Sequence, residues 1–240
     1  MTCEPRPRSF SSPSASGVAA LGMVGLTNVV IIVFALSLGA SAVYSIVSLI
    51  AKLTAEAGLA GQTTLINGAM AQREWLDFTY QILSIAFGLA PVALALYLLW
   101  QSVGRPFEAI GLQLANPGFW IWRGFALAAV IGIPGLALYV GSRLLGISSK
   151  IVPADLNEYW WTIPILLLAA VKAALLEEVL VIGYLFDRLQ RLGIMSNGQI
   201  LISAALRGSY HLYQGFGGFI GNFVMGLVFG WAYKKWGRVM

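Results

Sequence analysis

The sequence has little cysteine, little histidine and little charge. Its 240 residues include one cysteine and one histidine, and charged residues make up 10% of the chain. The lone cysteine, Cys3, excludes an intrachain disulfide, and no Cys/His cluster exists to form a structural zinc module. Soluble domains carry roughly 25% charged residues. Because 58% of the residues are hydrophobic and the mean hydropathy is +0.79, the composition indicates a protein embedded in a lipid bilayer.

The basic residues do not indicate nucleic-acid binding. The net charge is +5, but Lys and Arg are scattered between apolar runs and form no stripe, so we expect no nucleic-acid partner. They indicate orientation instead, because cytoplasmic loops are enriched in Lys and Arg. With the N-terminus in the cytoplasm, nine basic residues lie on the inner side, and four lie on the other side: Lys52, Arg73, Arg143 and Lys150. We therefore predict an integral protein of a bacterial-type plasma membrane with a cytoplasmic N-terminus.

Long apolar runs predict an all-α, polytopic transmembrane helical bundle of about six spans. A helix needs about 20 apolar residues to cross the bilayer. Residues 1–16 are rich in Ser and Pro and are predicted to be a disordered polar tail. Residues 17–158 hold the first spans, and 159–240 form a C-terminal unit whose spans contain charges. The predicted spans are 26–50, 79–101, 119–142, 159–185, 198–214 and 217–235.

Five ionisable residues fall inside or beside the apolar runs of the C-terminal unit: Lys172, Glu177, Glu178, Arg207 and His211. A charge at the bilayer centre costs about 2.5–3.5 kcal/mol even on the lenient insertion scale. Intramembrane charges therefore usually mark a functional site. The alternative is that they pair with one another and only lock helices together.

The two charged helices are predicted to be antiparallel and joined by the short turn LGIMSNG. In straight antiparallel helices, residues equidistant from the turn lie at the same depth. The numbers of Glu178 and His211 sum to 389, which centres on this turn, so we expect a carboxylate and an imidazole to meet inside the membrane. A carboxylate removed from water can act as a general base, and the imidazole can share the proton or hold the attacking water. The pair could equally supply two metal ligands, although a catalytic zinc generally takes three from the protein.

Two motifs here are typical of one family. EEVLVIG, which begins at Glu177, resembles the motif Glu-Glu-x-x-x-Arg, and RGSYH, which ends at His211, resembles Phe-x-x-x-His. Together with the Gly-rich run that follows, residues from about 160 to 240 resemble the CPBP family, the CAAX protease and bacteriocin-processing (Abi) intramembrane endopeptidases. The order, spacing and helical context of the motifs carry this resemblance.

The resemblance implies hydrolysis of peptide bonds within the membrane. Glu177 would activate the water, His211 would assist or bind a metal, and Glu178 would support the site. Whether the mechanism depends on glutamate or on a metal held by Glu177 and His211 is open. The implied partners, besides the lipid bilayer, are membrane-associated substrates: prenylated proteins with CAAX ends, or peptide precursors.

The sequence departs from the family pattern in three places. Ile182 stands where the first motif has arginine, and Arg207 stands where the second has phenylalanine. Because these two numbers also sum to 389, we hypothesise that Arg207 replaces the missing arginine as a partner of the glutamates; a simple ion pair is the alternative. The family's final helix, with His-x-x-x-Asn or His-x-x-x-Asp, is missing. We expect a fragment of a longer reading frame, whose next segment would complete the site and add a ligand if Zn²⁺ is bound.

Other residues and functions remain as alternatives. Asn222 is a supporting candidate that could hydrogen-bond across helices or reach the site. Lys172 is five residues before Glu177 and is expected to be structural. Buried carboxylates beside a histidine and an arginine also suit a proton- or ion-coupled transporter. A noncatalytic scaffold or immunity-type protein derived from the protease is the third possibility.

Overall fold

The computed structural model describes residues 15–110 and 117–236, and it is predominantly helical, which confirms the predicted all-α membrane bundle. The predicted tail, 1–16, lies outside the described residues except for its last two, which begin the first helix. The elements in chain order are α1 (Ala15–Ala35), α2 (Leu38–Thr54), β1 (Thr63–Gly68), α3 (Glu74–Gly88), α4 (Ala90–Val103), α5 (Pro106–Ala109), α6 (Pro117–Leu144), β2 (Lys150–Asp155), α7 (Thr162–Leu175), the π-helix η1 (Leu176–Tyr184), α8 (Leu185–Arg191), α9 (Ser196–Ser209), the 3₁₀ turn η2 (Leu212–Gln214) and α10 (Phe216–Trp236).

The number of spans differs from the expected six. Within residues 15–110 and 117–236, three helical stretches are long and apolar enough to cross a bilayer: Glu74–Val103, Ile121–Leu144 and Phe216–Trp236. The pair α1 and α2, bent by 52°, makes a fourth if it forms one span. The predicted span at 159–185 is not among them, because it contains three charged residues, Lys172, Glu177 and Glu178. The one at 198–214 is replaced by the 14-residue α9, about 21 Å long and too short for some 30 Å of hydrocarbon.

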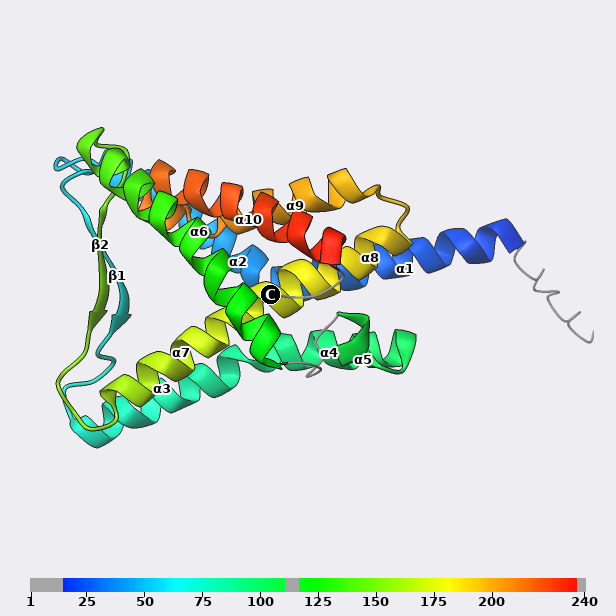
Figure 1. Ribbon diagram of the computed structural model, residues 1–240, viewed down its shortest axis with the longest axis horizontal. Coiled ribbons are helices and arrows are strands. Elements are labelled where there is room, and N and C mark those ends of the chain that lie inside the picture. Colours follow the sequence, from blue (N-terminus) through cyan, green and yellow to red (C-terminus); the bar gives the residue numbers. More distant parts are fainter. Residues whose placement is uncertain (1–14, 111–116, 237–240) are drawn as a thin grey trace, which may run out of the picture.

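The helices form two arms that converge at one end and diverge at the other (Figure 1). One arm consists of α3 and α7, which contact each other. The other contains α2, α9 and α10, and α6 crosses between the arms. They converge where η1 packs against α4 and where α8 contacts α1. The first residues of η1, which carry the two glutamates, therefore lie near the junction of the arms.

Two short strands that were not predicted bridge the open end of the arms (Figure 1). β1 connects α2 to α3, and β2 connects α6 to α7. They pair in parallel, with Thr63 opposite Lys150 and Gly68 opposite Asp155. A run of six residues between apolar spans carries too little periodicity to be distinguished from a loop. The strands gain their structure from each other, and together they tie the two arms.

Close packing of α9 against α10 depends on glycine. At Gly226 a Cβ atom would lie 2.7 Å from the Cα of Ala204, so no side chain fits there without moving a backbone. Small residues allow this close approach in membranes, where lipid supplies no hydrophobic force between helices. Gly215, which precedes α10, has φ of 103°, a backbone conformation that glycine adopts readily. Gly215 therefore allows the chain to reverse before α10, and Gly226 allows α10 to pack closely on α9.

The centre of the bundle is formed by η1. All residues from Val179 to Tyr184 are buried. Four of them are 0% exposed: Leu180, Val181, Ile182 and Tyr184. A π-helix is bonded from residue i to i+5 instead of i+4, and such turns often occur at functional sites. The wider turn also changes which residues of this helix face α9.

Candidate active site

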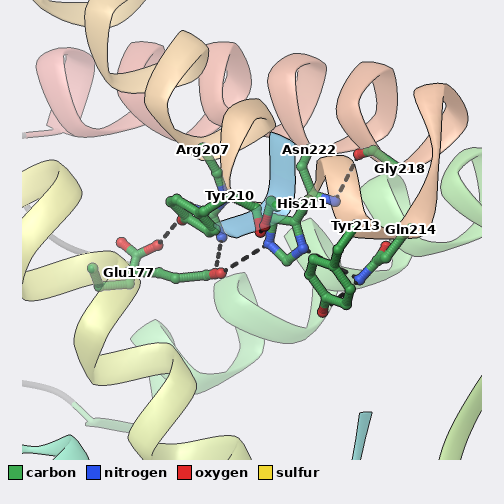
Figure 2. A network of polar contacts seen from close by, with 10 residues as sticks. Glu177, Arg207, Tyr210, His211, Tyr213, Gln214, Gly218 and Asn222 are labelled. Atoms are coloured by element: carbon green, nitrogen blue, oxygen red, sulfur yellow. Dashed lines mark hydrogen bonds and ion pairs between the residues drawn. The ribbon is translucent and has the colours of Figure 1, made fainter. Parts of the chain in front are cut away.

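The first turn of η1 and the last turn of α9 bring opposite charges together (Figure 2). Arg207 Nη2 donates to Glu177 Oε2 and forms an ion pair with it. Arg207 Nη1 lies 3.8 Å from Glu178 Oε1, so one guanidinium serves both carboxylates. The side chain of Arg207 is 3% exposed, against 20% for Glu177. The Arg207 guanidinium is therefore buried between helices, whereas the Glu177 carboxylate is partly exposed.

His211 lies just beyond α9 and contacts the same carboxylate. Its Nε2 atom is 3.3 Å from Glu177 Oε1. On the other side of the ring, the Gln214 side-chain nitrogen is 3.3 Å from Nδ1. With the Gln214 amide nitrogen as the donor to Nδ1, the tautomer that satisfies both contacts carries its proton on Nε2, which then donates to Glu177. A chain of polar contacts therefore runs from Gln214 through His211 to Glu177 (Figure 2).

His211 contacts a different glutamate from the one that we predicted. Equal depth along two straight helices predicted that His211 would meet Glu178, and in the structure it contacts Glu177. Where the helices meet, Ser203 Oγ donates to the Val181 carbonyl at 3.0 Å. The residue numbers of this pair sum to 384, and so do those of Glu177 and Arg207. The predicted pairing required a sum of 389, so the two helices are shifted by five residues relative to the prediction.

The shift has a geometric cause. From the end of α8 at Arg191 back to Glu177 is 14 residues, but from the start of α9 at Ser196 to Arg207 is 11. The wider π turns of η1 use more residues to cover the same length, so the assumption of two straight α-helices failed. Ile182 is consequently not level with Arg207. The expected pairing of Arg207 with a glutamate is present, and the guanidinium lies near both of them.

A cavity of about 470 Å³ opens beside Glu177. It lies between α2 and the junction of α7 with η1, and its wall includes Ser41, Ser45, Glu177, Tyr210 and His211. Most of the wall is apolar, with the carboxylate and imidazole among its few polar groups. A hydrophobic polypeptide segment and a water molecule could meet the carboxylate here.

Asn222 is placed differently from the other candidates. It lies on α10, and its amide nitrogen donates to the Gly218 carbonyl one turn earlier in the same helix, at 2.9 Å. It borders a second cavity, of about 300 Å³ between α6 and α10, which it shares with Gln214. Lys172 packs on Gly88 of α3, as expected for a structural residue.

Two contributors were missed by the sequence analysis. Gln214 stands three residues after His211, a spacing that brings side chains together in a helical turn and could have pointed to it. Phe229 on α10 lies under the Arg207 guanidinium, 4.8 Å from carbon to ring centroid. No local pattern identified Phe229, because the contact depends on how α10 packs against α9.

The donors present do not fit a complete zinc site. Over residues 15–110 and 117–236, no three side chains of His, Cys, Asp or Glu gather to hold a metal ion. A catalytic zinc generally takes three protein ligands. Glu177 and His211 also contact each other, and each has a further partner: Arg207 for Glu177 and Gln214 for His211.

Comparison with known proteins gives one match. Residues 159–240 match the family described as type II CAAX prenyl endopeptidase, Rce1-like. This confirms the resemblance predicted from the two motifs, and the matched range coincides with the C-terminal unit of the sequence analysis. No curated protein and no solved structure matches the chain.

Proposed function

Because residues 159–240 match the Rce1-like CAAX prenyl endopeptidase family, we propose that this protein is an intramembrane endopeptidase in which Glu177 activates the attacking water. The observation that carries the proposal is the position of Glu177. Its carboxylate lines the cavity and is held from two sides, by Arg207 and by His211. A base that is fixed in place, yet open to a substrate cavity, is what general-base hydrolysis requires.

The contacts leave room for a water on the carboxylate. Two carboxylate oxygens offer about four acceptor positions. Arg207 and His211 occupy one each. A water bound at a remaining position gives its proton to Glu177, and its oxygen adds to the substrate carbonyl carbon. Glu177 then passes the proton to the amine that leaves when the peptide bond breaks.

Arg207 and His211 have separate tasks in this scheme. Arg207 balances the negative charge that Glu177 brings into a low-dielectric site, and it steadies one oxygen. His211 orients the other oxygen through its Nε2 proton and can turn that proton toward the oxyanion of the tetrahedral intermediate. Glu178, the second partner of Arg207, helps to hold the guanidinium in place.

We propose polypeptides at the membrane as substrates, either with prenylated CAAX ends or as peptide precursors. The cavity wall is mainly apolar in area, and its lining includes Leu38 and Leu176 as well as Ser41, Ser45 and Glu177. Such a wall suits a hydrophobic segment whose backbone needs a few hydrogen bonds.

The test is cleavage of fluorogenic peptides by the full chain in lipid nanodiscs. One peptide ends in a farnesylated CAAX sequence, and its pair lacks the farnesyl group. We expect Glu177→Gln to lower kcat by about 10²–10⁴-fold, the usual contribution of a general base. Glu108→Gln is the matched control, because Glu108 is exposed and pairs with Arg105 on α5. Cleavage at the unaltered rate by Glu177→Gln, or no cleavage of either peptide, would contradict the proposal.

A further inference from the structure

The turn that carries His211 is held by side chains from distant parts of the chain. The last carbonyls of a helix have no partners within it and need donors from elsewhere. Ser45 Oγ donates to the Tyr210 carbonyl at 2.9 Å, across 165 residues of sequence. The backbone nitrogen and the Oγ atom of Ser149 both lie 3.1 Å from the Gln214 carbonyl.

The strongest donor in this group is Lys52, in the last turn of α2. Its ammonium donates to the Tyr213 carbonyl at 2.6 Å and to Thr64 Oγ1 at 2.5 Å. Thr64 in β1 is in turn 2.6 Å from Ser149 Oγ. Hydrogen bonds from a charged donor are roughly twice as strong as neutral ones. Lys52 therefore joins α2, the parallel ribbon and the turn after α9 at one point.

These donors explain the ribbon at the open end of the arms. The pairing of β1 with β2 sets Thr64 opposite Ile151, two residues from Ser149, so both hydroxyls reach the same turn. Ser148 also bridges to Gly215 at the end of that turn. The residues that hold the turn all lie outside the family-matched range, 159–240: Ser45, Lys52, Thr64, Ser148 and Ser149.

We infer that Lys52 is a positioning residue for His211, and this inference rests on the proposed function. By fixing the Tyr213 carbonyl, its ammonium sets the turn between His211 and Gln214. That turn determines how the imidazole meets both Gln214 and Glu177. His211 lies between the rings of Tyr210 and Tyr213, with centroids 4.8 and 6.1 Å away, so the ring follows its backbone (Figure 2).

The experiment compares Lys52→Met, Lys52→Arg and Lys172→Met in the full chain in nanodiscs. Methionine keeps the length of the side chain and removes the donor, and arginine keeps a cation. Lys172→Met is the matched control, because Lys172 packs on Gly88 away from the turn. The readouts are kcat and KM for the farnesylated peptide, and hydrogen–deuterium exchange of the backbone from 211 to 217.

We expect Lys52→Met to lower kcat by about 10–100-fold with little change in KM, because a misplacement of about 1 Å can cost 10²-fold in rate. Exchange in the turn should rise. Lys52→Arg should recover most of the rate, and Lys172→Met should resemble the unaltered protein. Unchanged exchange in Lys52→Met would overturn the inference, as would increased exchange with unchanged kcat.

The exchange measurement also separates this inference from the proposed function. If the unaltered protein cleaves neither peptide, the endopeptidase proposal fails by itself. The hold of Lys52 on the turn would then still be supported by faster exchange in Lys52→Met but not in Lys172→Met.

Discussion

Arg207 is the residue on which the charges of the site depend. It is 3% exposed and stands between two carboxylates that bring negative charge into the bundle. Each ion would be costly alone in a low-dielectric interior, and a pair becomes tolerable only when its partners meet. The guanidinium also covers the Phe229 ring. The apolar surroundings make the pair hard to break and its cation hard to replace.

Replacing this cation should destabilise the protein. We expect Arg207→Met to lower the free energy of unfolding by about 3–5 kcal/mol, because it leaves buried carboxylates without a partner. Arg105→Met is the control, since Arg105 and Glu108 pair at 3.3 Å with side chains 77% and 56% exposed. Exposed pairs contribute about 0–1 kcal/mol. Unfolding in increasing SDS measures both, and equal losses would show that the Arg207 pair is energetically a surface pair.

At the scale of elements, η1 determines which side chains share a face. In an α-helix a residue five positions after Glu177 points well away from it, but π bonding from i to i+5 sets that residue about one turn along. Ile182 occupies this position and is fully buried. The π-helix therefore offers a reason why an arginine there, as in the family motif, could reach the glutamate that Arg207 reaches from α9.

This predicts a rescue across two helices. Arg207→Phe alone should lose most peptide cleavage, and adding Ile182→Arg should restore much of it, because the new cation lies one π turn from Glu177. Val181→Arg with Arg207→Phe is the control, since Val181 is equally buried but one residue out of phase. Rates of cleavage and yields of folded protein decide the matter. Equal rescue by both double variants, or by neither, would contradict the replacement hypothesis.

At the scale of the whole molecule, the bundle has two chemically different ends. The ribbon end holds β1 and β2, and the far end holds α5 and the turn between α8 and α9 (Figure 1). Among the described residues, six basic residues lie toward the far end, Arg105, Arg123, Arg188, Arg191, Lys234 and Lys235, and four lie toward the ribbon, Lys52, Arg73, Arg143 and Lys150. Because cytoplasmic loops are enriched in Lys and Arg, we predict that the far end is cytoplasmic and the ribbon faces the other side.

Labelling of single cysteines tests this orientation. In a chain with Cys3→Ser, a membrane-impermeant maleimide should label Asp155→Cys at the ribbon in intact cells. It should label Glu108→Cys at the far end only after the cells are permeabilised. Both positions are exposed, so a difference reports sidedness and not burial. The reverse pattern would place the ribbon, and the open end of the arms, in the cytoplasm.

The sequence by itself determined the solvent, the helical class and the residues worth attention. Long apolar runs with few charges indicate a bilayer, and a charge inside such a run is visible without any structure. The same local signals identified Glu177 and His211, and their motifs identified the family that matches residues 159–240. These conclusions depend on residues close together in the chain, which is why they could be predicted.

Only the tertiary structure decided which of these residues meet. The π turns of η1 shifted the helix pair, so His211 contacts Glu177 in place of the predicted Glu178. The count of six spans was not confirmed, because α9, with 14 residues, is too short to cross the bilayer by itself. The bond from Lys52 to the Tyr213 carbonyl spans 161 residues. Such contacts arise from packing among distant segments, and no pattern within one segment encodes them.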